Sequence, residues 1–205
     1  MSFLAGDGKA ALTLAITAFE AETAAELVVV VEARAGHYLH VGALFGVLGA
    51  LACLTFLLYG EPSFDLHWFI LDPLLAGLLT AYLGSSWPRL ERALTPRKRR
   101  EAWVLRAARA AFVARGVADT RGRTGVLCYV AVAERRAVVL ADLGVRQAVP
   151  AEAWTQAIAP LQTVVARGGH ASEVAPLLVA LGKLCGEQLP RQHDDENELS
   201  DEVDG

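Results

Sequence analysis

Two apolar stretches lie back to back between residues 41 and 83 of this 205-residue chain. The first, Val41–Tyr59, contains no charged side chain, and the second, Leu66–Leu83, contains one acid, Asp72. At about 1.5 Å per residue, a helix of either length matches a bilayer's hydrocarbon core of roughly 30 Å. A buried helix of a soluble protein rarely stays uncharged for so long. The pair therefore predicts a transmembrane helical hairpin, the alternative being a very apolar soluble domain.

Basic residues are distributed asymmetrically around this hairpin and predict its orientation. Six of them lie between residues 89 and 100, and Lys9 and Arg34 precede the first stretch. The tip has Glu61 and Asp65 and no Lys or Arg. Because basic flanks normally stay in the cytoplasm, we expect a two-pass protein of the cell (inner) membrane, with both termini cytoplasmic.

Asp72, in the second stretch, allows two interpretations. It precedes Pro73, and Asp–Pro commonly starts a helix, with Asp as the N-cap and Pro at the first helical position. The second helix would then begin at Asp72, which is what we expect. The other interpretation is a functional acid inside the membrane, as in a transporter-like protein.

The segments outside the hairpin predict an α/β fold. A helix-bearing crossover favours parallel pairing of the first two strands, whereas a tight turn makes the last two antiparallel. The result is a small mixed β-sheet flanked by helices, an α/β/α sandwich, interrupted by the hairpin. Pro160 should kink or split the helix that contains it, and Ser172 should cap the last helix. The expected elements are helices 9–26, 99–115, 151–166 and 173–187 and strands 27–33, 126–133 and 137–142.

The chain divides into four expected segments. Residues 1–40 are too few to bury a good core alone, so they should complete one domain with residues 89–190. The hairpin occupies residues 41–88 between these two parts. The acidic tail, residues 191–205, lacks hydrophobic periodicity and is expected to be disordered.

The chain has a net charge of −4, but its charged residues are unevenly distributed along the sequence. Residues 89–123 hold eleven Lys or Arg against three acids, whereas residues 194–205 hold seven acids and no base. The basic run follows a membrane stretch on the side that meets anionic lipid, and no nucleic-acid-binding motif accompanies it. Nucleic-acid binding is therefore not expected. The residues expected to bind a membrane surface or a partner are Arg97, Lys98, Arg99 and Arg100.

Two acids at strand ends, Asp119 and Asp142, are the candidate metal ligands. A phosphatase needs either a nucleophile or clustered carboxylates that hold a metal ion. His193, Asp194 and Asp195 could join them if the tail folded back. The competing interpretation is that both acids have surface or loop-capping roles. No GxSxG, P-loop or HExxH motif is present.

The remaining candidate ligands give weaker patterns. His37 and His40 have the i, i+3 spacing of a metal pair, but no third ligand is near in sequence, so we expect interfacial residues at the membrane entry. The three cysteines, Cys53, Cys128 and Cys185, show no CxxC spacing and are expected to be structural thiols in a reducing compartment.

Five short motifs mark the segments outside the hairpin: Thr124–Gly125 before an apolar strand, Glu134–Arg135–Arg136 in a turn, Asp142–Leu143–Gly144 after the third strand, Trp154, and Asp194–Asp195 with Asn197–Glu198–Leu199 near the end. Together with the strand AELVVVVEA they resemble the TPM-domain family. The chain looks most like the bacterial membrane branch, in which a transmembrane hairpin interrupts the domain after its first strand. The resemblance implies an α/β/α sandwich.

The resemblance also implies a range of functions. Some members are associated with acid phosphatase activity, some bind divalent metal, and others are accessory subunits of membrane proteins. Members with metal sites have Asp-Asn-Gly before the second strand and a Gly-rich turn with a nearby Glu after the third. Here those positions read Arg123–Thr124–Gly125 and Asp142–Leu143–Gly144–Val145–Arg146, so two acids or amides are replaced, one of them by Arg146.

We therefore expect an accessory, scaffolding or quality-control binding module at the cytoplasmic membrane face. The alternative is a metal-dependent phosphatase at the membrane surface that uses Ca²⁺ or Mg²⁺. Expected partners are the bilayer and, through the hairpin, another membrane protein or a second copy of the chain. Gly42, Gly46 and Gly49 would either allow close helix packing or be scattered on a lipid-facing span.

Overall fold

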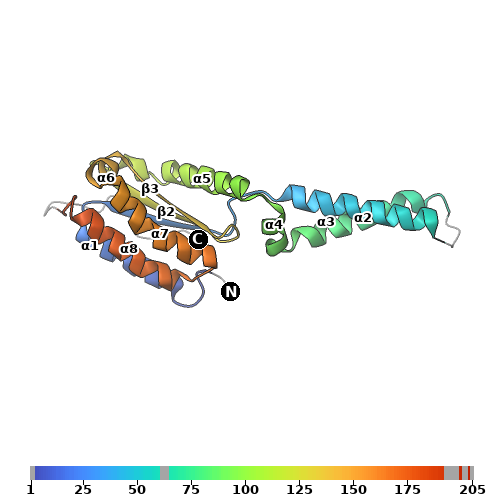
Figure 1. The fold of residues 1–205 in the computed structure, drawn as a ribbon, viewed down its shortest axis with the longest axis horizontal. Coiled ribbons are helices and arrows are strands. Elements are labelled where there is room, and N and C mark those ends of the chain that lie inside the picture. Colours follow the sequence, from blue (N-terminus) through green and yellow to red (C-terminus); the bar gives the residue numbers. More distant parts are fainter. Residues whose placement is uncertain (1–2, 61–64, 192–198, 200–202, 204–205) are drawn as a thin grey trace. The chain divides into compact units, whose positions relative to one another are not determined.

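The computed structural model describes residues 3–60, 65–191, 199 and 203 (Figure 1). The chain forms two compact units, each described here by itself. The α/β unit comprises Met1–Ala35 and Glu101–Gly205, and the hairpin unit comprises Gly36–Arg100.

The sheet of the α/β unit has three strands in the order β1-β2-β3. β1 (Glu26–Glu32) pairs in parallel with β2 (Gly125–Ala131), and β2 pairs antiparallel with β3 (Arg136–Ala141). The β-branched valines of β1 are buried on both faces of the sheet, as expected for a strand covered by helices on both sides. The mixed sheet predicted from the sequence is confirmed.

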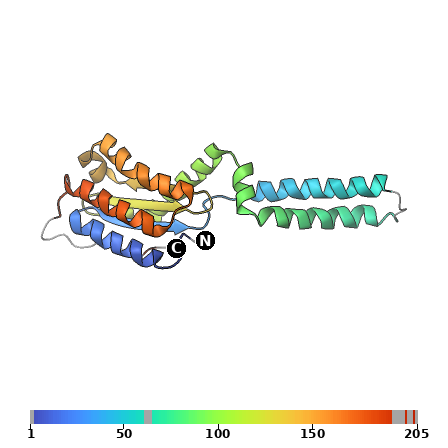
Figure 2. The ribbon, with the colours of Figure 1, turned by 60° about the horizontal axis from the view of Figure 1, so that its bottom comes forward.

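Helices cover both faces of this sheet (Figures 1 and 2). Leu27 and Val29 face the core formed with α1, α7 and α8, which we call the first core. Val28 and Val30 face the second core, with Val104 of α5. Alternating strand residues therefore supply two cores, which is the α/β/α sandwich expected. The helices concerned are α1 (Gly8–Glu22), α5 (Arg97–Ala114), α7 (Ala151–Arg167) and α8 (Ala171–Gly186).

Some helix details differ from the sequence-based expectations. Pro160 does not split α7: it is an exposed residue inside the continuous helix. The cap of α8 is His170, not Ser172. Its backbone N–H donates to Glu173 Oε1 at 3.0 Å, which makes a capping box. Two further short helices, α4 (Pro88–Leu94) and α6 (Leu143–Ala148), were not predicted.

The acidic tail is described only in part. The expectation of disorder falls largely on residues 192–198, 200–202 and 204–205, which lie outside the described residues. Leu199 is partly buried against the second core, and Val203 is 2% exposed in the first core. At these two positions the tail contributes apolar side chains to the α/β unit.

The hairpin unit contains two long helices, α2 (Leu39–Tyr59) and α3 (Trp68–Ser85), that run side by side (Figure 2). Both are long and apolar enough to cross a membrane. Only 17% and 11% of their most apolar windows are buried within the protein, whereas the core helix of a soluble protein would be mostly buried. Large apolar side chains therefore point outward, among them Val47, Leu48, Leu51, Leu74, Leu75, Leu78 and Leu79.

Asp72 is not the N-cap of α3, so that prediction was wrong. The helix begins at Trp68, where the His67 carbonyl accepts from the backbone N–H of Ile70 and Leu71 at 3.3 and 3.1 Å. Pro73 lies inside the helix, where only about one turn precedes it. The apolar residues 68–71, which precede the expected start, make the first turn of the helix.

The glycines of α2 face α3 within the same hairpin. A Cβ built on Gly46 would lie 3.1 Å from the carbonyl oxygen of Gly77, and one built on Gly77 would lie 3.1 Å from the Gly46 carbonyl oxygen. A Cβ on Gly49 would overlap the Thr80 side chain, and one on Gly42 would lie 3.6 Å from Ser85 Cβ. Of the two interpretations of these glycines, the structure supports close helix packing.

Candidate functional site

The candidate metal ligands lie at one end of the sheet. Because β2 and β3 are antiparallel, the start of β2 and the end of β3 are adjacent, with Val126 paired to Ala141. The backbone N–H of Asp142 donates to the Gly125 carbonyl at 2.9 Å. The loop before β2 and the junction between β3 and α6 therefore meet here, although they are separate in sequence.

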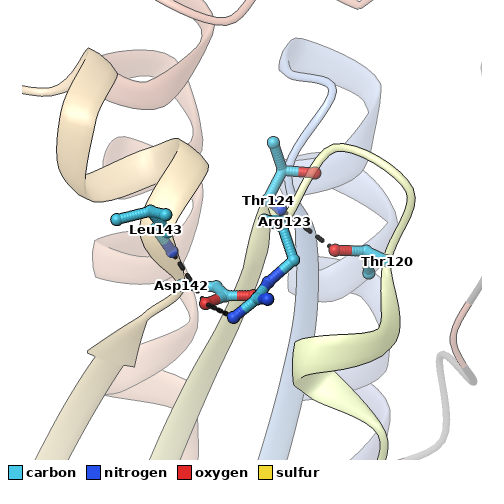
Figure 3. A network of polar contacts seen from close by, with 5 residues as sticks. All are labelled: Thr120, Arg123, Thr124, Asp142 and Leu143. Carbon is cyan, nitrogen blue, oxygen red and sulfur yellow. Dashed lines mark hydrogen bonds and ion pairs between the residues drawn. The ribbon is translucent and has the colours of Figure 1, made fainter.

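Arg123 and Asp142 form a bidentate ion pair at this junction (Figure 3). Arg123 Nε donates to Asp142 Oδ2 at 2.6 Å, and Arg123 Nη2 donates to Asp142 Oδ1 at 2.9 Å. Oδ1 also accepts the Leu143 backbone N–H at 2.8 Å, so Asp142 caps α6. The Asp142 side chain is 8% exposed and that of Arg123 is 56% exposed. The guanidinium thus covers the carboxylate from the solvent side.

The backbone around Arg123 is shaped to present this side chain. Arg123 has a φ of 53°, in the left-handed region that non-glycine residues rarely adopt. Its carbonyl accepts the Gly144 N–H at 2.8 Å, and the Thr124 N–H donates to Thr120 Oγ1 at 3.0 Å. A Cβ on Gly144 would lie 2.9 Å from the Arg123 carbonyl oxygen. The close approach of the two loops therefore requires glycine at position 144.

The ion pair shifts the ionisation of both partners. The side-chain hydrogen bond from Arg123 lowers the pKa of Asp142; burial opposes this shift, and the Leu143 N–H and the charges of Arg123 and Arg146 support it. The same bond raises the pKa of Arg123, and the negative charge of Asp119 adds to that effect. Both groups are therefore held in their charged forms at neutral pH.

Arg123→Ala is expected to lower the melting temperature by a few degrees at neutral pH and by progressively less in acid. Because the pKa of Asp142 is depressed in the folded state, its contribution is complete above the unfolded value of about 3.9. That contribution is lost as the pH falls through the lower folded-state value. The measurement is thermal unfolding of the two proteins from neutral pH down to about pH 3.

Arg167→Ala is the matched control for this experiment. Arg167 pairs with Glu173, but the pKa of Glu173 is lowered first by the His170 backbone N–H, which the control leaves in place. The control should therefore change stability little at any pH. A gap between Arg123→Ala and the parent chain that stays constant down to the acid limit would contradict the role given to Asp142.

The residues at this end of the sheet do not fit a divalent cation. Both Asp142 oxygens are engaged by Arg123, and the charge of Arg146 also acts on this carboxylate. Ca²⁺ and Mg²⁺ need about six oxygen ligands. Within the described residues, no three His, Cys, Asp or Glu side chains are grouped as a metal site. Asp119, on the 3-10 turn η1 (Val117–Asp119), would supply only one further carboxylate. The other candidate ligands, His193, Asp194 and Asp195, lie outside the described residues.

The histidines near the hairpin have another arrangement. His40 Nε2 lies 3.1 Å from Thr95 Oγ1, at hydrogen-bond distance, and its ring stacks on Tyr38 with centroids 6.4 Å apart. His37 is exposed. His40 therefore has a positioning role in the hairpin unit.

The opposite end of the sheet holds buried polar groups that the sequence did not single out. Glu134, 1% exposed, accepts the Ala35 backbone N–H at 3.2 Å. Tyr129 donates its hydroxyl to Glu32 Oε2 at 2.7 Å, and burial, followed by this hydrogen bond, raises the Tyr129 pKa. The only sequence signal was the turn motif Glu134–Arg135–Arg136, whose three charged residues gave no hint that Glu134 is buried.

Arg97, Lys98, Arg99 and Arg100 form the first turn of α5. The first three are exposed and Arg100 is half-buried. They belong to the hairpin unit, and the opposite end of the sheet and the Arg123–Asp142 pair belong to the α/β unit. The two sets of candidate residues are therefore considered separately.

No family model and no curated protein matches this chain. Among solved structures, it is similar to the NMR structure of BA42 protein from the psychrophilic bacterium Bizionia argentinensis. The TM-score is 0.60 and the sequence identity is 17%, over 99% of this chain and 95% of that one. At this identity the similarity concerns the fold alone, and it agrees with the α/β fold described above.

Proposed function

We propose that this chain is a membrane-anchored TPM-like domain that acts by binding, as an accessory, scaffolding or quality-control module at the cytoplasmic face of the cell membrane. The observation that carries the proposal is the Arg123–Asp142 pair. It engages both oxygens of the carboxylate that a metal-dependent phosphatase of this fold would need as a ligand. A carboxylate held by a guanidinium in this way is neither an open metal ligand nor a general base.

The proposed membrane anchor is supported by the hairpin unit. α2 and α3 are long enough to cross a bilayer, and they pack on each other through glycines while their leucines point outward. The basic residues lie on the flanks of the hairpin and the acids Glu61 and Asp65 at its tip. The positive-inside rule then places both termini in the cytoplasm.

The test combines a partner search with an activity assay. The full chain, purified in mild detergent, is expected not to hydrolyse para-nitrophenyl phosphate with Ca²⁺, with Mg²⁺ or with a chelator. In a pull-down from native membranes, the same chain should retain a partner at a constant molar ratio of partner to bait. A Gly125→Ala bait, whose α/β unit should be destabilised while the hairpin stays intact, should lose that partner.

Two outcomes would count against the binding module. One is metal-stimulated turnover that Asp142→Asn abolishes, since Asn keeps the helix cap and removes only the charge. This result would favour the metal-dependent phosphatase. The other is a folded bait that retains no partner in any mild detergent.

A further inference from the structure

β1 lies at an edge of the sheet, so the backbone on one of its sides is not paired with β2. The Leu27 N–H donates to Glu20 Oε1 at 3.2 Å and therefore points away from β2. Because backbone groups point to alternate sides along a strand, those of Val29 and Val31 also point away from β2. We call this side of the strand the outer edge of β1.

The outer edge of β1 is shielded from solvent. Val29 is 0% exposed and Val31 is 6% exposed, backbone included. Buried backbone N–H and C=O groups are almost always paired, because a buried group without a partner costs about as much free energy as a lost hydrogen bond. Among the described strands, only β2 pairs with β1, and it does so on the opposite side. Another segment of the chain therefore covers the outer edge.

The chain that leaves α8 arrives next to this edge. The Leu189 carbonyl accepts the Ala24 N–H at 3.0 Å, two residues before β1 begins. Arg191 Nη1 then donates to the backbone carbonyl of Glu20 at 3.1 Å, and the Glu20 side chain is the one that bonds the outer edge. The acidic tail, residues 191–205, therefore begins beside the outer edge of β1.

The acidic tail contains two apolar residues, and they are buried on opposite faces of the sheet. Leu199 packs against the second core, and Val203 is 2% exposed in the first core. The four residues from one to the other span at most about 14 Å. So short a segment passes from one face of a sheet to the other only around its rim. Because the tail begins beside the outer edge of β1, the crossing is expected there.

From this arrangement we propose that residues 199–203 of the acidic tail occupy the outer edge of β1 and shield it from pairing with a strand of another chain. An open strand edge is a template for such pairing, and proteins protect it by covering it or by placing charges on it. The acidic tail supplies both kinds of protection, because Glu198, Asp201 and Glu202 are close in sequence to the two apolar anchors. A second copy of the chain would therefore meet a covered and negatively charged edge.

The test is hydrogen exchange of single β1 amides in the full chain, purified in mild detergent. Leu199→Ser/Val203→Ser removes both anchors and should speed exchange of the Val29 and Val31 amides about tenfold. The Val30 amide, which points towards β2, should change far less. Unchanged exchange at Val29 would mean that another segment covers the outer edge, and it would overturn the proposal.

Two further variants keep this result interpretable. Leu14→Ser/Val113→Ser makes the same two substitutions at side chains that are 71% and 74% exposed, so it should leave β1 exchange unchanged. Leu199→Ser alone keeps the Val203 anchor in the first core, and it covers the case in which the double variant unfolds. It too should speed the outer-edge amides selectively. Equal acceleration of all β1 amides in this single variant would overturn the assignment of the tail to the outer edge.

Self-association measures the shielding separately. Size-exclusion chromatography with light scattering should show that Leu199→Ser/Val203→Ser associates more strongly with rising protein concentration than the parent chain does, because its strand edge is free to pair. The exposed control variant should behave like the parent. Faster exchange at the outer edge without increased association would refute the shielding role of the tail.

Discussion

Gly125→Ala is expected to destabilise the α/β unit by about 3 kcal/mol, the upper end of the usual cost of overpacking. Gly125 is the first residue of β2, and a Cβ there would overlap the Val117 carbonyl oxygen and lie 2.7 Å from Val117 Cγ1. Both residues are buried. Because the conflict involves backbone, a change of side-chain rotamer cannot relieve it, and either η1 or the start of β2 must move.

Hydrogen exchange of the β2 amides measures this effect separately from the hairpin unit. The matched control is Gly122→Ala, three residues earlier in the same loop. The atoms nearest to a Cβ at Gly122 would be those of the Thr124 side chain, at 3.2 and 3.3 Å, so the conflict is with a side chain rather than with backbone. The control should cost less than about 1 kcal/mol. Equal protection of the β2 amides from exchange in the two variants would show that Val117 can move to accommodate the added methyl group.

Gly46→Leu is expected to separate α2 from α3. The Gly46 and Gly77 backbones are in contact, and a Cβ on Gly46 would lie 3.1 Å from the Gly77 carbonyl oxygen and 3.2 Å from Ala81 Cβ. A leucine would add three more carbon atoms in that space. A packing cost of about 2 kcal/mol corresponds to a roughly thirtyfold loss of the closed hairpin.

A disulfide provides the readout for this hairpin. The Gly42 and Ser85 Cβ positions are 3.6 Å apart, within the usual disulfide range of about 3.5–4.5 Å. Gly42→Cys/Ser85→Cys in a Cys53→Ala background should therefore cross-link on mild oxidation. Burial raises the pKa of Cys128 and of Cys185 to about 12, so these two thiols should not compete.

The cross-link should form in the reporter background and fail when Gly46→Leu is added. Val47→Leu is the matched control, because Val47 is next to Gly46 on the same helix and is 58% exposed. It should leave cross-linking unchanged. Cross-linking that survives Gly46→Leu would mean that the two helices do not depend on the Gly46–Gly77 contact.

Hydrophobic pattern was sufficient to predict most of the fold. The valine run of β1 predicted a strand buried on both faces, and the turn at Glu134 predicted the antiparallel pair. The two apolar stretches predicted both helices of the hairpin. The bounds of α2 agree to within two residues, the usual uncertainty of helix ends, whereas α3 begins at Trp68 and not at the expected Asp72. α6 was not predicted, because six residues are too few to show helical periodicity and its start depends on the Asp142 cap.

The sequence identified the two main residues of the candidate site but not how they interact. Asp142 was identified as a strand-end acid, and Arg123 as a replacement in a motif. Their pairing was not predicted, because it depends on the β2–β3 register and on the positive φ of Arg123, neither of which leaves a pattern in sequence. Asp72 shows the same limit: a local Asp–Pro signal was overridden by the apolar turn before it.

The parallel pairing of β1 with β2 has a consequence for the order of events during synthesis. β1 ends at Glu32 and β2 starts at Gly125, and the whole hairpin lies between them. Among the described strands, β1 pairs only with β2. During synthesis, the valine-rich strand β1 is therefore made before its partner β2, and it stays unpaired until α2, α3 and α5 have been synthesised. Under the proposed membrane anchoring, insertion of the hairpin would precede completion of the sheet, and a chain that failed to insert would expose an unpaired, aggregation-prone strand edge.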